Sequence, residues 1–198
     1  MTAPTPPAAR RPRSHAVRYA HLAVVVMVAL QLADSSVMHK PKHGAPGDAF
    51  FALHVTLGLG TVAAVLLLWL AVLLLGGRDG TAVGALFPWF SPRRRRALRD
   101  EAYAAFALLR AWRLPGVEAT AAALAPAVHG LGMLAVTALV ATGALGWYGG
   151  LSPLLDLHEA LVTPLWIYLG GHAGTALLHL LAGEDTISAM FLPWRHKP

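Results

Sequence analysis

The chain has 198 residues, of which 56% are hydrophobic and only 13% charged, and its formal net charge is +6. Such a composition is too apolar for an ordinary soluble domain and predicts a membrane protein, whose arginine-rich cytoplasmic face accounts for the positive charge without nucleic-acid binding. Cysteine is absent, which excludes disulfides, thiolate metal sites, iron–sulfur clusters and covalently attached c-type haem.

The N-terminal segment, residues 1–16, is rich in Pro, Ala and Arg and has no apolar period, which predicts a disordered cytoplasmic tail. The first apolar run follows at 17–37. Its basic flank and the ADSS sequence after it resemble a signal peptide with a cleavage region. We favour an uncleaved helix because it completes an even set of four spans.

Three further apolar runs follow at 50–75, 120–148 and 155–181. The first of these has roughly 26 residues, which as a helix measure about 39 Å, more than the ~30 Å hydrocarbon core, so that it can span while tilted. The short connections HKPKHGAPGD and YGGLSP make the joined helices antiparallel neighbours. We therefore predict an all-α, transmembrane four-helix bundle over 17–183, with a cytoplasmic C-terminal tail at 184–198.

The long connection 76–119 contains a predicted amphipathic helix from Arg94 to Trp112. Its apolar positions are Leu98, Ala102, Ala105, Phe106, Leu109 and Trp112. We expect a surface helix on the cytoplasmic side. The arginine run 93–96 is typical of topological anchoring and contact with anionic membrane lipids, and a specific partner site is the alternative.

The distribution of Lys and Arg predicts the orientation. The two short connections carry only Lys40 and Lys42, whereas the two tails and the long connection carry the other basic residues. Both termini are therefore expected in the cytoplasm.

Several of the ten histidines lie inside the apolar runs, where an ionisable side chain is costly and marks a functional site by default. His21 lies about one turn into the first span and His54 about one turn into the second. His158 and His172 both lie in the fourth, fourteen residues apart, which is a rise of about 21 Å and within about 40° of a whole number of turns. Both should face the bundle interior.

Depth then pairs these residues across the bundle. His158 is level with His54 near the outer face, and His172 with His21 in the inner half. Two imidazoles from facing helices hold the iron of a non-covalent b-type haem, so we predict an outer haem on His54 and His158 and an inner haem on His21 and His172.

The same histidines have alternative interpretations. They could be packing or proton-relay residues, which would make the chain a haem-free transporter or assembly factor that uses paired histidines for metal or protons. A zinc or copper path would more naturally bring in carboxylates, Cys or Met, and the second span contains no acid.

Three further residues lie where they could serve the inner haem. His129, in the inner half of the third span, could bind a quinone or a haem propionate, or make a plain interhelical hydrogen bond. His179 could face a propionate or be structural. Arg18, three residues before His21, could neutralise a propionate, although snorkelling to the headgroups is its ordinary role. Glycines such as Gly130, Gly143 and Gly170 leave room for a helix or a porphyrin.

Four segments resemble the bacterial cytochrome b561 and nickel-hydrogenase cytochrome b family. They are RYAHLAVVVMVAL, FFALHVTLGLG, HGLGMLAVTALVATGALG and LHEALVTPLWIYLGGHAGTALLHLLAGEDTISAMFLP. The resemblance covers nearly the whole chain, and its strongest element is the last segment.

The resemblance implies that His21 and His172 bind a cytoplasmic-side haem and that His54 and His158 bind a periplasmic-side haem. It also implies a multi-pass protein of the bacterial inner membrane that exchanges respiratory electrons with the quinone pool. Its redox partner would be a hydrogenase, a dehydrogenase or a c-type cytochrome, and any enzymatic role would be as part of an oxidoreductase. Whether the chain acts alone, as a homodimer or as a complex subunit is left open.

Overall fold

The computed structural model describes residues 14–42, 45–75, 83–111, 123–181, 183 and 190, without the side chains of Leu109 and His179. The expectations for residues 1–13, for Trp112, for the side chain of His179 and for the C-terminal tail other than Met190 therefore lie outside the described part of the chain.

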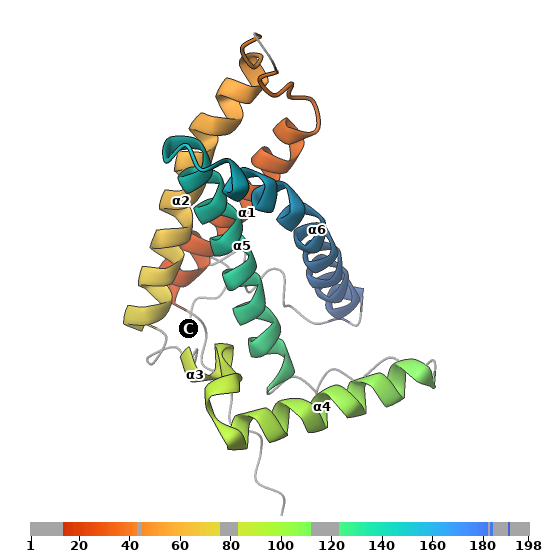
Figure 1. Ribbon diagram of the computed structural model, residues 1–198. Coiled ribbons are helices and arrows are strands. Elements are labelled where there is room, and N and C mark those ends of the chain that lie inside the picture. The colour runs from red at the N-terminus through yellow and green to blue at the C-terminus, as the bar shows by residue number, and fades with distance from the viewer. Residues whose placement is uncertain are drawn as a thin grey trace, which may run out of the picture.

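The described residues form helices and no strand (Figure 1). In chain order the elements are α1 (His15–Ser35), α2 (Ala49–Leu75), α3 (Val83–Leu86), the 3-10 turn η1 (Pro88–Phe90), α4 (Pro92–Arg110), α5 (Leu124–Tyr148) and α6 (Ser152–Leu181). By length and hydropathy, α1, α2, α5 and residues 152–178 of α6 could each cross a membrane. The prediction of an all-α chain with four candidate transmembrane spans is confirmed.

The helix ends differ from the expected ones where local signals act. α1 begins two residues before Val17 because the Ser14 side chain caps it, accepting a 3.3 Å hydrogen bond from the backbone N–H of Val17. The last residues of the expected disordered tail are thus helical. α6 begins at Ser152, three residues earlier than expected, since Pro153 suits the first turn of a helix.

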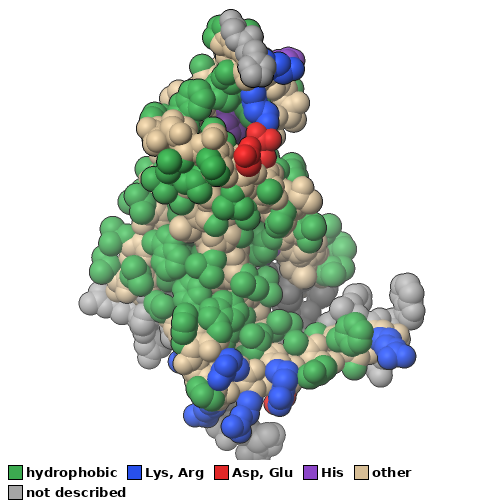
Figure 2. Space-filling model, in the orientation of Figure 1, with side chains coloured by type: hydrophobic (Ala, Val, Ile, Leu, Met, Phe, Trp, Pro, Cys, Tyr) green, Lys and Arg blue, Asp and Glu red, His purple; other side chains and the backbone are tan. Residues whose placement is uncertain are grey.

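The long helices bury small and β-branched residues together with a few leucines, and they leave many other leucines exposed. On α2, Ala64, Val65 and Val72 are buried, whereas Leu66 and Leu74 are exposed. The core joins α1, α2, α5 and α6 through residues that include Val24, Val28, Leu68, Val136 and Leu165. Hydrophobic side chains cover the flanks of the molecule (Figure 2). An exposed apolar surface of this extent fits contact with lipid chains.

One end of the bundle is closed by α3, η1 and α4, and α4 crosses that end (Figure 1). Glu101 links α4 to α5. Its carboxylate accepts hydrogen bonds of 2.9–3.0 Å from the backbone N–H groups of Ala123 and Leu124 at the start of α5. Lys and Arg side chains line this end (Figure 2), while Tyr103 and Phe106 of α4 are exposed. Arginine and aromatic side chains are therefore both exposed on α4.

Candidate functional site

The outer histidine pair brings α2 and α6 together. The rings of His54 and His158 lie with their centres 6.3 Å apart and their planes at 77°. The structure therefore places side by side two residues that are separated by most of the chain.

His158 is fixed by α5. Its Nδ1 lies 2.8 Å from the backbone carbonyl oxygen of Leu139, and since a carbonyl only accepts, Nδ1 is the donor. A Cβ on Gly143, one turn further along α5, would lie 2.9 Å from both Cε1 and Nδ1 of His158. The absence of a side chain at Gly143 is what admits the imidazole. Nε2 of His158 is left as the nitrogen with a lone pair.

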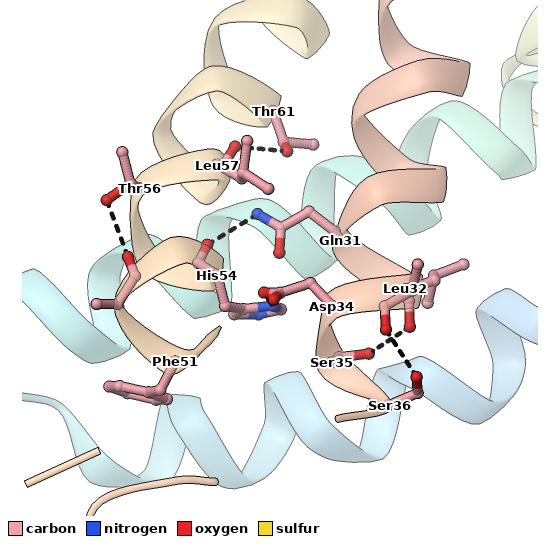
Figure 3. Close-up of polar contacts among 12 residues, drawn as sticks. Gln31, Leu32, Asp34, Ser35, Ser36, Phe51, His54, Thr56, Leu57 and Thr61 are labelled. Carbon is pink, nitrogen blue, oxygen red and sulfur yellow. Dashed lines mark hydrogen bonds and ion pairs between the residues drawn. The ribbon is translucent and has the colours of Figure 1, made fainter. Parts of the chain in front are cut away.

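His54 is fixed by α1, from which two polar side chains point at it (Figure 3). A carboxylate oxygen of Asp34 lies 3.5 Å from Nδ1 of His54. The side-chain amide of Gln31 donates a 2.9 Å hydrogen bond to the backbone oxygen of His54. As in His158, the Nδ1 side of the ring faces protein, which leaves Nε2 available.

The inner pair joins α1 and α6. The ring centres of His21 and His172 are 6.4 Å apart, with the planes at 66°. Tyr168, one turn before His172, stacks on it at 5.5 Å and 9°. His129 of α5 lies on another side of His172, with ring centres 5.1 Å apart. The inner group is thus richer in ring contacts than the outer one.

Arg18 lies one turn before His21 and is only 6% exposed. Its Nε is buried and donates no hydrogen bond to any of the described residues. The side chain therefore does not snorkel out of the bundle, and a buried guanidinium needs an anion nearby. The structure shows a cationic group beside the inner pair.

Both pairs fit a bis-imidazole metal site. A metal ion bound to an imidazole nitrogen lies about 2 Å from that nitrogen and about 3 Å from the ring centre, so two imidazoles on opposite sides of one ion have ring centres about 6 Å apart. The observed separations are 6.3 and 6.4 Å. Nδ1 of His158 donates to a backbone carbonyl, which is a usual arrangement around a metal-binding histidine, and Nδ1 of His54 lies 3.5 Å from a carboxylate oxygen. The residues present therefore suit axial ligation of haem iron.

The entry of α2 is set by Asp48, which lies outside the membrane-spanning helices. Its carboxylate accepts a 2.8 Å hydrogen bond from the backbone N–H of Phe51 and contacts the His39 ring at 2.9 Å. These interactions, the backbone hydrogen bond first, hold the pKa of Asp48 below its ordinary value. This cap, six residues before His54, sets the start of α2 at Ala49.

Sequence reasoning singled out the four paired histidines, His129 and Arg18, and the structure brings these six into two groups, while the side chain of His179 lies outside the described residues. It missed Asp34, Gln31 and Tyr168. Asp34 is an acid inside an apolar run, which is a site signal in itself. Tyr168 precedes His172 by four residues, a spacing that places both on one helix face.

A family model described as prokaryotic cytochrome b561 matches residues 13–193. No curated protein and no solved structure matched the chain. The match extends over all four long helices and both histidine pairs. The chain belongs to the prokaryotic cytochrome b561 family, whose members are membrane proteins that transfer electrons through b-type haem.

Proposed function

We propose that this chain binds two b-type haems, one near each membrane face, and carries electrons across the bacterial inner membrane between the quinone pool and a redox partner protein. The observation that carries the proposal is that one helix, α6, offers two imidazoles fourteen residues apart, each meeting another imidazole at 6.3–6.4 Å. His54 and His158 are the proposed ligands of the outer haem iron, and His21 and His172 those of the inner one.

When bound, each haem would supply one-electron chemistry, with its iron alternating between the ferric and ferrous states. The protein's own groups hold the ligands ready. The Leu139 carbonyl keeps the proton of His158 on Nδ1, and Gly143 leaves room for the ring. The lone pair of Nε2 therefore points away from α5 without reorganisation of the helix.

Charged and polar side chains near the inner pair have proposed roles toward the propionates. Arg18 is buried and cationic, which supports charge neutralisation of a propionate. His129 lies beside His172, a position that supports contact with a propionate or with a quinone carbonyl. His179, two turns after His172, is proposed to face a propionate on the ground of its sequence position alone.

The proposed topology has both termini in the cytoplasm, with residues 17–183 as the membrane domain and α4 as a cytoplasmic surface helix. The positive-inside rule supports this orientation. The arginines of α4 and its exposed Tyr103 and Phe106 support contact with anionic headgroups and the lipid boundary. The proposed redox partner is a hydrogenase, a dehydrogenase or a c-type cytochrome. The exposed apolar faces of the helices are also compatible with a homodimer.

Purification tests the proposal directly. The full chain in detergent should be red, with a reducible b-type spectrum and close to two haems per chain. His158→Ala and His172→Ala should each lose about one haem, while Tyr19→Ala, an exposed change on α1, should keep both. A colourless protein that binds zinc would instead support the haem-free transporter or assembly factor. Retention of both haems in the two histidine variants would contradict the ligand assignment.

A further inference from the structure

Asp34 is a carboxylate inside the membrane-spanning part of α1 and is only 7% exposed. Neither of its oxygens accepts a hydrogen bond within the described part of the chain, and its ion-pair contact is Nδ1 of His54 at 3.5 Å. Burial of a carboxylate is unfavourable unless a partner compensates. The position of Asp34 therefore points to a role at His54.

Gln31 lies one turn before Asp34 on the same face of α1. Its amide donates to the backbone oxygen of His54, while Asp34 faces the imidazole of the same residue (Figure 3). Two adjacent polar groups of α1 thus converge on one residue of α2. Gln31 is neutral and contacts the backbone of His54, whereas Asp34 contacts the imidazole ring of His54 and can carry a negative charge.

The two outer histidines differ in what faces their Nδ1 atoms. His158 donates to a neutral backbone carbonyl, and His54 faces a carboxylate. The negative charge of a carboxylate 3.5 Å from Nδ1 favours the tautomer that carries its proton there, which leaves the electron pair of Nε2 for a metal. In a low-dielectric interior its negative charge also stabilises the ferric state, which carries one more positive charge than the ferrous state.

We propose that Asp34 is a positioning residue for His54 that lowers the reduction potential of the outer haem. This inference rests on the proposed function, since it needs His54 to be an axial ligand. It assigns the effect to the outer haem, because Nδ1 of His54, a proposed ligand of that haem, is the atom that the Asp34 carboxylate contacts.

The test is a redox titration of D34N in the full-length, haem-loaded chain. H172A is added to leave the outer haem alone, and H158A is added in a parallel series to leave the inner haem alone. At a fixed ambient potential, D34N should raise the ferrous-to-ferric ratio of the outer haem at least tenfold, which is about 59 mV for a one-electron couple. The inner haem should titrate as before. D34E, which keeps the charge, should restore the original potential of the outer haem.

Two variants control for other causes. Glu159→Gln removes a carboxylate beside His158, but this one is 56% exposed and paired with Lys40, so it should leave both potentials unchanged. Gln31→Leu removes the neutral contact to His54 and should shift the outer potential less than D34N does.

The outcomes separate this inference from the function on which it rests. Loss of the outer haem in D34N with its retention in D34E would support the positioning role of Asp34. An unchanged outer potential in D34N, equal shifts of both haems, or an equal effect of Glu159→Gln would overturn the inference and leave the proposed function standing. A haem-free wild-type protein would overturn the proposed function itself.

Discussion

His158 donates a 2.8 Å hydrogen bond from Nδ1 to the backbone carbonyl oxygen of Leu139, so that α5 determines which nitrogen of this α6 residue is left for a metal. α5 also leaves room for the His158 ring at Gly143, since a Cβ there would lie 2.9 Å from two atoms of the ring. A ligand fixed in this manner needs little reorganisation on binding, and the variants below test that fixation and its surroundings.

Gly143→Ala should lower the outer haem content to well under one per chain while the inner haem is retained. The added methyl group displaces the His158 ring, whereas alanine in place of glycine favours a helix by about 1 kcal/mol, so helix propensity cannot explain a loss. Haem per chain by pyridine haemochrome is the measurement. Ala141→Val, which also adds bulk but at an exposed position of the same helix, is the matched control. Equal haem content in both variants would show that Gly143 is not needed for the site.

Arg18→Gln should lower the reduction potential of the inner haem and leave that of the outer haem unchanged. Arg18 is proposed to face a propionate of the inner haem, and removal of its buried positive charge from that position favours the ferric state. A potentiometric titration of both haems measures the effect. Arg99→Gln, an exposed change on α4, should alter neither potential. A normal inner potential in Arg18→Gln would remove Arg18 from the proposed site.

Glu101→Ala should destabilise the end of the bundle at which α4 lies by roughly 1–2 kcal/mol, because the backbone N–H groups of Ala123 and Leu124 lose a charged acceptor at a helix N-terminus. Thermal unfolding in detergent, followed by circular dichroism, measures it. Asp100→Ala changes the neighbouring, exposed carboxylate and should have little effect. Equal unfolding midpoints for the two variants would contradict the capping role of Glu101.

Asp48 should make stability fall in acid. Its pKa is lowered in the folded chain, so the ionised carboxylate stabilises the fold above the ordinary pKa of an aspartate, and this contribution is lost as the pH falls through the lower folded value. Asp48→Asn keeps a capping side chain but cannot titrate. The unfolding midpoint, measured against pH, should therefore fall less steeply in acid for the variant than for the wild-type chain. Parallel profiles would contradict this account.

The sequence was sufficient to predict the four spans and the proximity of the paired histidines. Helix rise gives the depth of each histidine in the membrane, and the helical period gives the side of the helix on which it lies. The fourteen-residue spacing in α6 assumed a regular helix, and Pro164 lies between His158 and His172. The helix nevertheless continues through it. Proline removes one backbone hydrogen bond, and transmembrane helices tolerate that loss.

The surroundings of the proposed ligands could not be predicted in the same way. The contact of Asp34 with His54 depends on how α1 packs against α2, and neither apolar period nor depth determines that register. Residues 88–90 form a 3-10 turn and Leu86 packs its backbone against Gly130, an arrangement that the expected loop did not contain. Tertiary packing determines both features, so the sequence alone does not predict them.

The pairing of the ligands is the central claim, and haem content of double variants tests it most directly. Two histidines that share one iron should not have additive effects. His54→Ala with His158→Ala, and likewise His21→Ala with His172→Ala, should each retain about one haem per chain, whereas His54→Ala with His172→Ala should retain none. Loss of both haems in either matched pair, or retention of one in the mixed pair, would contradict the assignment.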